Sequence, residues 1–242
     1  MLFDTHAHYD DSRFDGDRDA VLAALPEAGV ELVLDPGCDL PSSRAAAALA
    51  ERYSHVYAAA GIHPENCAGF QDADLAALRQ LLAQPKVAAI GEIGLDYYWS
   101  GEFVAEQVEA FVSQCRLAAR LGLPVAIHTR AAWDDMCRII GEEATAAAEA
   151  GRRLRGVFHA FSEDAVTYRK LKACGDFAFG IGGVVTFRKS KLADTVREME
   201  LDDIVLETDC PYLTPAPHRG ERNESAYVRF VCEKVAELKG LP

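Results

Sequence analysis

The sequence predicts an α/β protein folded as a (β/α)8 TIM barrel. Eight short apolar runs alternate with eight stretches that have the pattern of amphipathic helices. Strands separated by helices run parallel, because a parallel connection needs a long crossover. The length of 242 residues suits eight such units in one closed barrel. An open doubly wound sheet is the alternative, but no G-x-G-x-x-G motif follows the first strand.

The predicted strands are apolar runs that end in glycine, proline or polar residues. Pro36 and Gly37 follow the second strand, and Gly182 and Gly183 follow the seventh. We expect the strands at residues 2–8, 30–35, 56–62, 87–93, 124–128, 156–161, 177–181 and 204–208.

Helices are expected between and after these strands. Ser42 or Ser43 can cap the second helix, and Gly29 and Gly122 end the first and the fourth. We expect the helices at residues 18–28, 42–53, 74–82, 104–121, 133–150, 164–174, 192–199 and 224–239. No linker, charge run or low-complexity segment divides the chain, so one domain over residues 1–242 is expected.

Composition excludes several classes of protein. Half of the residues are hydrophobic, which allows a sizeable core, and the formal net charge is −13. That charge argues against a broad basic surface for duplex nucleic acid, but not against a nuclease whose metal ions meet the phosphate. No signal peptide opens the chain and no apolar run is long enough to span a bilayer, so we expect no membrane partner.

The cysteines are widely spaced and form no C-x-x-C motif, which favours neither a zinc knuckle nor a disulfide framework. Free thiols in a reducing cytosol are expected, and with them a cytoplasmic location. The seven cysteines are Cys38, Cys67, Cys115, Cys137, Cys174, Cys210 and Cys232.

Residue types that bind metals recur at the carboxyl ends of the predicted strands. In a TIM barrel these ends form the active site. Five of the 7 histidines lie there, whereas chance would scatter them through loops and helices. The polar strand-end residues are His6, His8, His63, Glu92, His128, Arg130, His159, Glu207 and Asp209.

Glu92 lies inside an apolar strand, where a carboxylate is costly unless a positive charge neutralises it. No Lys or Arg is nearby in sequence, so a metal ion or a protonated histidine must serve. His6 and His8 are one residue apart, so on a strand they and Asp4 point the same way. Paired imidazoles at a strand end are half of a metal site.

The candidate ligands suit two divalent ions with Glu92 between them. His6, His8, Glu92 and Asp209 can hold one ion, and Glu92, His128 and His159 the other. Two such ions polarise the electrophile and activate a water molecule. Magnesium, manganese, zinc or iron suits this mixture of carboxylates and imidazoles.

The remaining roles follow from position. Asp209 is the expected general base, so it is a catalytic candidate together with Glu92 and His63. Glu207 lies on the same face of its strand as Asp209. It can bind a third ion, or it can hydrogen-bond to a metal ligand and so orient that ligand. His63 and Arg130 are available to bind an anionic substrate or to stabilise charge in the transition state.

Other features allow more than one interpretation. Cys210 is expected to be buried and inert, because alternation turns it away from Asp209. The run Tyr97-Tyr98-Trp99 can stack on a base or anchor its loop to the core. His218 can be structural or can contact the substrate.

Seven blocks of sequence, in order along the chain, resemble the TatD family of metal-dependent deoxyribonucleases. The resemblance implies a TIM barrel of the metallo-dependent hydrolase type that cleaves DNA phosphodiesters, often from a 3′ end. It also implies that His6, His8, Glu92, His128, His159 and Asp209 are metal ligands and that His63 lies close to the scissile phosphate. The blocks are Asp4-Thr5-His6-Ala7-His8, Gly61-Ile62-His63-Pro64, Gly91-Glu92-Ile93-Gly94-Leu95-Asp96, His128-Thr129-Arg130, Phe158-His159-Ala160-Phe161-Ser162, Glu207-Thr208-Asp209-Cys210-Pro211-Tyr212-Leu213 and Pro217-His218-Arg219-Gly220 with Asn223.

The chain departs from the family pattern in three places. Ala160 stands where the family usually has Cys, and Ala131 and Ala132 stand where an acidic residue is usual. These departures affect contacts around the ligands and leave the ligands intact. Family members commonly continue past residues 237–240 with another helix, so the chain either lacks that helix or closes its barrel without it.

We therefore expect a 3′-end exodeoxyribonuclease that uses a water molecule activated by two metal ions. Its partner is expected to be a DNA end or a small phosphodiester, and the expected oligomeric state is a monomer. The main alternative is an amidohydrolase that cuts C–N or carboxylic ester bonds with the same dinuclear site. Arg130, Arg188, Lys189 and Arg219 lie just beyond strand ends and favour phosphate. A scaffold protein would have a damaged ligand set, and a structural metal site would be a closed tetrahedral cage.

Overall fold

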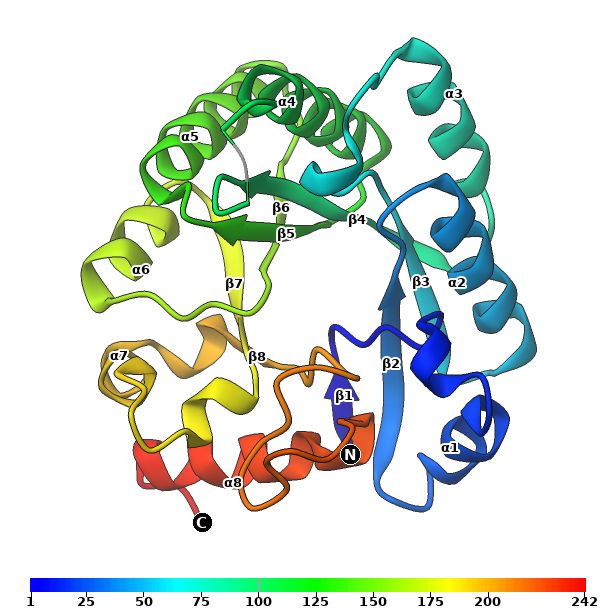
Figure 1. The fold of residues 1–242 in the computed structure, drawn as a ribbon. Coiled ribbons are helices and arrows are strands. Elements are labelled where there is room, and N and C mark those ends of the chain that lie inside the picture. The colour runs from blue at the N-terminus through cyan, green and yellow to red at the C-terminus, as the bar shows by residue number, and fades with distance from the viewer. Residues whose placement is uncertain (100) are drawn as a thin grey trace.

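A computed structural model of the chain describes residues 1–99 and 101–242. In this part of the chain one sheet of eight parallel strands runs in the order β1 to β8, with helices around it, which confirms the predicted TIM barrel (Figure 1). The strands are Leu2–Asp4 (β1), Val30–Pro36 (β2), Val56–Ala60 (β3), Val87–Asp96 (β4), Val125–Arg130 (β5), Arg155–Phe158 (β6), Asp176–Ile181 (β7) and Ile204–Leu206 (β8). The helices are Arg18–Ala24 (α1), Leu40–Arg52 (α2), Asp72–Leu81 (α3), Val104–Leu121 (α4), Trp133–Glu149 (α5), Ala165–Lys172 (α6), Leu192–Glu198 (α7) and Val228–Lys239 (α8).

The barrel closes between β8 and β1. The Thr5 amide donates to the Leu206 carbonyl at 3.0 Å, and the Asp209 amide donates to the His6 carbonyl at 2.9 Å. A single parallel bridge joins Ala7 to Cys210. These contacts bring residues 5–7 and residues 206–210 together at the carboxyl end of the barrel.

The regular parts of β1 and β8 are shorter than predicted. The prediction placed His6 and His8 within the first strand, but its ladder ends at Asp4. The reason is local: the buried Asp4 carboxylate accepts hydrogen bonds from the Thr208 amide at 2.9 Å and the Thr208 hydroxyl at 2.6 Å. A side chain thus replaces the backbone partner where β1 meets β8. The sixth strand is also shorter, ending at Phe158, one residue before His159.

Helix α2 begins earlier than predicted because Asp39, and not Ser42 or Ser43, is its cap. The Asp39 carboxylate accepts from the Ser42 amide at 2.8 Å, and the Ser42 hydroxyl accepts from the Asp39 amide at 2.9 Å. This reciprocal pair is a capping box, which satisfies two amides that the first helical turn leaves unpaired. At the end of α4, Gly122 adopts a left-handed φ of 69° and stops the helix as predicted.

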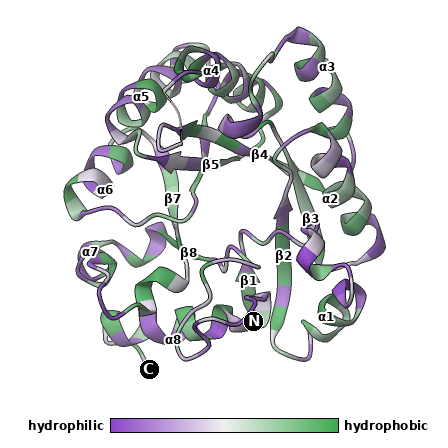
Figure 2. Ribbon diagram, in the orientation of Figure 1, coloured by the Kyte–Doolittle hydropathy of each residue, from purple (hydrophilic) through white to green (hydrophobic). Residues whose placement is uncertain are grey.

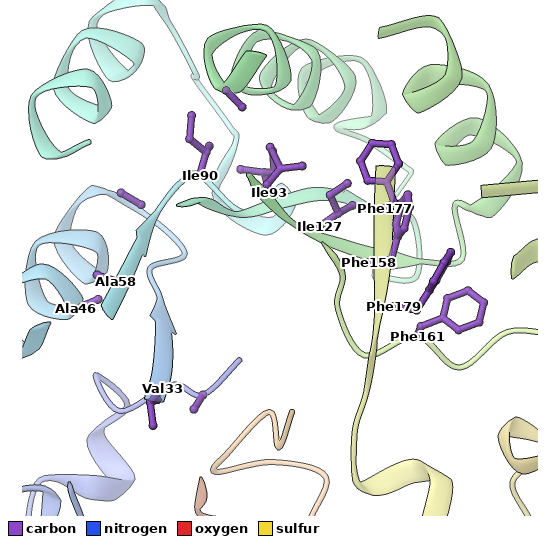
Figure 3. Close-up of a cluster of buried hydrophobic side chains, with 14 of the residues drawn as sticks. Val33, Ala46, Ala58, Ile90, Ile93, Ile127, Phe158, Phe161, Phe177 and Phe179 are labelled. Atoms are coloured by element: carbon purple, nitrogen blue, oxygen red, sulfur yellow. The ribbon is translucent and has the colours of Figure 1, made fainter. Parts of the chain in front are cut away.

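The main core lies between the strands and the surrounding helices. Figure 3 shows Ile90, Ile93 and Ile127 from β4 and β5, beside a group of phenylalanines that includes Phe158 and Phe179. The rings of Phe158 and Phe179 stack with centroids 5.7 Å apart. Hydrophobic and hydrophilic residues alternate along the helices, so each helix can bury one face and expose the other (Figure 2).

Gly91 sets the position of the residue that follows it. A Cβ atom at this position would lie 2.7 Å from the Cβ of Ala126 on β5, so only glycine lets the two strands approach this closely. The close approach carries Glu92 into the carboxyl half of the barrel. All seven cysteines are free thiols, as predicted. In the part of the chain that the structure describes, none of the helices has the length and apolarity needed to cross a membrane.

Candidate metal centre

Glu92 is the centre of a cluster of histidines at the carboxyl end of the barrel. Its Oε2 lies 3.4 Å from Nε2 of His6 and 3.6 Å from Nε2 of His8. Its Oε1 lies 3.0 Å from Nε2 of His159 and 3.1 Å from Nδ1 of His128. The two oxygens therefore face two different pairs of imidazoles, one from the β1 end and one from the ends of β5 and β6.

Asp209 completes the half of the cluster that contains His6 and His8. Its Oδ1 lies 3.5 Å from Nε2 of His8 and 3.9 Å from Nε2 of His6. The residue has a φ of 57°, a left-handed conformation that is uncommon outside glycine and that Asp tolerates better than most residues. The hydrogen bond from its amide to His6 helps to hold this backbone in place.

Two further carboxylates lie beside the half of the cluster that contains His128 and His159, next to the ring nitrogens that face away from Glu92. Oδ2 of Asp96 lies 2.9 Å from Nε2 of His128, so this ring turns its Nδ1 toward Glu92. Oε1 of Glu207 accepts the Ala160 amide at 2.5 Å and lies 3.6 Å from Nδ1 of His159. Carboxylates in this position fix the tautomer and the orientation of a metal-binding imidazole. Glu207 has room because a Cβ at Gly180 would lie only 2.0 Å from its Oε2.

The carboxylates of Glu92 and Asp209 are ionised at neutral pH, because the pKa of each lies below its usual value. Burial acts to raise the pKa of Glu92, but the charges of His159 and His6 outweigh it and hold that pKa well below the usual value. Burial opposes ionisation of Asp209 too, and the hydrogen bond from His8 helps to bring that pKa below its usual value. The site is thus electronegative wherever its histidines are neutral.

The histidines divide into two kinds. Burial acts to lower the pKa of His8, but Asp209 and Glu92 outweigh it and raise that pKa to about 9. Burial lowers the pKa of His63 to about 4, so its ring is neutral at physiological pH. Nδ1 of His63 accepts the Glu65 amide at 3.2 Å, which leaves the ring proton on Nε2, 3.7 Å from Oε1 of Glu92.

The donor chemistry of the cluster fits divalent metal ions. Every ion-pair partner of Glu92 within residues 1–99 and 101–242 is a histidine. Nε2 of His6 and Nε2 of His8 face each other at 3.2 Å, which requires a proton or a cation between them. Four groups place their candidate ligand atoms within 4.8 Å of one another: His6 with His8 and Asp209, His6 with His159 and Glu207, His8 with Cys38 and Glu92, and His63 with Glu92 and His128.

Sequence reasoning missed two residues of this cluster. Asp96 shares a strand face with Glu92 by the two-residue period of β4, a signal that was present in the sequence. Cys38 follows the end of β2, and its Sγ lies 3.8 Å from Oε2 of Glu92. Both could be found by extending the strand-end rule to every Asp, Glu, His and Cys at a strand terminus.

The predicted basic residues lie farther out. Arg130 ends β5 with an exposed guanidinium group 3.7 Å from the ring centroid of Tyr98. Arg219 is also exposed and lies 3.9 Å from the ring centroid of Phe187. Neither forms an ion pair with the described residues of the cluster. Neither guanidinium group is placed to neutralise the charge of Glu92.

The structure also places the aromatic run 97–99, Cys210 and His218, for which the sequence allowed more than one interpretation. Tyr97 anchors its loop, because its hydroxyl bonds to Asp135 at 3.1 Å, whereas Tyr98 and Trp99 are exposed. Cys210 is buried, as predicted. His218 stacks on Tyr227 with ring centroids 4.3 Å apart, which gives it a structural contact in the loop after β8.

A closed eight-stranded barrel with a buried histidine–carboxylate cluster at the carboxyl ends of its strands defines a TIM-barrel metal-dependent hydrolase. The comparisons with known proteins agree. Residues 3–242 match the family described as "TatD related DNase", and the chain belongs to this family.

Three relatives illustrate the match. The chain is 40% identical over 240 residues to the "Uncharacterized metal-dependent hydrolase YabD" of Bacillus subtilis (strain 168), covering 99% of this chain and 91% of that protein. It is 34% identical over 245 residues to the "3'-5' ssDNA/RNA exonuclease TatD" of Cronobacter sakazakii, covering 99% of this chain and 90% of that protein. The crystal structure of the TatD homologue YJJV from Escherichia coli K12 superimposes with a TM-score of 0.90 at 31% identity, covering 100% of this chain and 91% of that one.

Proposed function

We propose that this hydrolase cleaves phosphodiester bonds in DNA, removing nucleotides from a 3′ end with two divalent metal ions, magnesium, manganese or zinc. One observation carries the proposal. The two oxygens of Glu92 face separate sets of imidazoles, His6 with His8 on one side and His128 with His159 on the other. A carboxylate shared in this way is the arrangement that a two-metal site needs.

The residues that would hold the ions are those of the two sets. His6, His8, Asp209 and Oε2 of Glu92 would hold one ion; His128, His159 and Oε1 of Glu92 would hold the other. When bound, two divalent ions supply Lewis-acid activation of the scissile phosphate and of a water molecule.

The protein's own groups account for the proton and the substrate charge. The carboxylate of Asp209 is ionised, and its side chain retains 15% of its exposure, so it can accept a proton from a water molecule in the site. Neutral His63 presents an N–H at Nε2, which can donate to a phosphate oxygen. Arg130 at the rim can pair with the same or the next phosphate. Glu207 orients His159 without contacting the substrate.

The choice of DNA ends rests on charge and on a relative. A net charge of −13 suits an enzyme that takes a short end into a cleft and does not hold a long duplex. The relative from Cronobacter sakazakii is named as a 3′-5′ exonuclease of single-stranded DNA and RNA. We propose the same polarity for this chain. Seven free thiols support a cytoplasmic location, and we propose that the protein acts there as a monomer.

The test pairs metal content with turnover. The protein is stripped with a chelator, reloaded with magnesium, manganese or zinc in turn, and given a 3′-labelled single-stranded DNA. The expected result is metal-dependent release of the 3′ label as a mononucleotide, and metal-dependent stepwise shortening of the same strand when it is labelled at its 5′ end. Metal-loaded protein that leaves DNA intact and instead cuts amide or carboxylic ester substrates would overturn the proposal in favour of an amidohydrolase. Faster cleavage of RNA than of DNA would overturn the choice of nucleic acid.

A further inference from the structure

A cavity lies beside the metal centre, between the loop that follows β3 and the loop that follows β4. Its volume is about 370 Å³, and Pro64, Asp96, Trp99 and Phe103 contribute to its walls. Pro64 directly follows His63, and Asp96 bonds to His128 on its other side. The cavity and the metal centre are therefore separated by a single layer of side chains.

Two aromatic rings at this cavity are left in solvent. Trp99 is 66% exposed and Phe103 is 38% exposed, and both belong to its lining. The guanidinium group of Arg130 lies 5.1 Å from the ring centroid of Trp99, so a positive charge borders the aromatic surface. Exposed aromatic rings beside a cation form the kind of surface on which the bases of single-stranded nucleic acids stack.

The floor of the cavity offers few groups for hydrogen bonding. Oε1 of Gln107 accepts the Asp96 amide at 2.8 Å, and its Nε2 donates to the Asp96 carbonyl at 2.8 Å, so this side chain is already engaged. The thiol of Cys67 bonds to the Pro64 carbonyl at 2.9 Å. At the open edge, the carboxylate of Glu65 forms no hydrogen bond or ion pair with the described residues. Recognition here would rest on stacking, with one acceptor at the edge.

We propose that this cavity holds the base of the terminal nucleotide, stacked on Trp99 and Phe103, while the adjoining phosphodiester reaches Arg130 and the metal centre. This inference rests on the proposed function, and it names the substrate class as single-stranded or frayed ends. A paired base is stacked in its duplex and must leave that stack to enter. Stacking accepts every base, and Glu65 favours bases that carry an amino group over thymine.

Binding is tested on the full chain loaded with magnesium, without any turnover. The sequence holds 2 tryptophans, so Trp133→Phe leaves Trp99 as the only one. Titration with dAMP should quench the Trp99 fluorescence to saturation, whereas 2-deoxyribose 5-phosphate, which lacks the base, should not. Phe103→Ala in this background should weaken dAMP binding about five- to a hundredfold, the range expected for one lost stacking ring.

A matched control lies at the opposite end of α4, the helix that Phe103 precedes. Leu121, at the far end of α4, is 38% exposed, the same fraction as Phe103. Leu121→Ala should leave dAMP binding unchanged. Equal quenching by the sugar phosphate, or unaltered dAMP affinity in Phe103→Ala, would overturn the base pocket.

A kinetic experiment separates this proposal from the proposed function. For the unaltered chain, a single-stranded DNA with an abasic 3′-terminal sugar should have a KM about tenfold above that of the intact strand. In the double variant Trp99→Ala/Phe103→Ala the two strands should have the same KM, because both stacking rings have gone. Cleavage of both strands with equal KM by the unaltered chain overturns the pocket and leaves the nuclease. Saturable dAMP binding without any DNA cleavage overturns the nuclease and leaves a nucleotide site.

Discussion

The two halves of the histidine cluster are built differently. Around His128 and His159, each ring meets a second carboxylate on its far side, Asp96 in one case and Glu207 in the other. Nδ1 of His6 and Nδ1 of His159 are both buried without a hydrogen-bond partner. The difference is that Nδ1 of His159 has Glu207 within 3.6 Å, whereas no second carboxylate pairs with His6 or His8 from the far side in the residues that the structure describes. The half around His128 and His159 therefore has carboxylates in place behind both rings before any ion arrives, whereas the half around His6 and His8 has none. Solvent reaches both halves, since the side chain of His128 is 18% exposed and that of Asp209 is 15% exposed. We therefore expect the half around His128 and His159 to retain its ion more tightly than the other half.

The largest effect should come from removing the residue that the halves share. Glu92→Gln keeps the size of the side chain but removes the charge that faces both pairs of histidines. We expect hydrolysis to fall about a thousandfold or more and metal content to fall in both halves, because each loses a ligand oxygen. Metal analysis and initial rates measure the two effects.

Glu143→Gln is the control for this change. Glu143 is also a buried glutamate, but it pairs with Arg116 away from the cluster. The Glu143→Gln variant should keep its metal content and its rate of hydrolysis. Full metal content in Glu92→Gln would show that the halves bind ions independently of the shared carboxylate.

Asp209→Asn should separate proton transfer from metal retention. The amide cannot accept a proton as the carboxylate does, so kcat should fall about a hundred- to ten-thousandfold. Metal content should fall less than in Glu92→Gln, because His6, His8 and Glu92 remain. A rate within a few-fold of the unaltered chain would remove Asp209 from the role of general base.

Asp96→Asn tests the support behind His128. Loss of the carboxylate should weaken metal affinity about ten- to a hundredfold, and only in the half that contains His128. In a competition titration with a chelator, the two halves of the unaltered chain should lose their ions at two close midpoints. In Asp96→Asn the two midpoints should be well separated. Asp202→Asn, at an exposed aspartate outside the cluster, serves as the control. Equal weakening of both midpoints would contradict the division into halves.

The smallest effect is a dependence of metal uptake on pH. In the metal-free chain the pKa of His8 is raised to about 9, so this ring carries a proton at pH 7. A metal ion needs the neutral ring, so binding must release that proton. Between pH 6 and pH 9 the apparent affinity of this half should rise by up to about tenfold per pH unit, and it should level off above the pKa. Calorimetry in buffers of different ionisation enthalpy would count the protons, and a count of zero at pH 7 would contradict the raised pKa of His8.

The sequence was sufficient for the fold because its signals repeat. Each predicted strand is an apolar run that ends in glycine, proline or polar residues, and the glycine at 122 stops α4 where the pattern predicted. The ligand candidates followed from one rule about strand ends, and the structure brings His6, His8, Glu92, His128, His159 and Asp209 together. The boundaries failed where a side chain competes with the backbone, as Asp4 does at the seam and Asp39 does at α2. Such bonds join residues far apart in sequence or depend on one rotamer, so periodicity does not reveal them.

The seam that closes the barrel also decides when the protein can first become active during its synthesis. The backbone of His6 is bonded to Asp209, and the amide of His8 donates to Cys210 at 2.7 Å. A ribosome makes the first two histidines at the start of translation but the aspartate near the end, so the nascent chain carries an incomplete cluster for most of its synthesis. The candidate metal centre therefore cannot assemble until synthesis is nearly finished, and a prematurely terminated product that stops before residue 209 has no complete site.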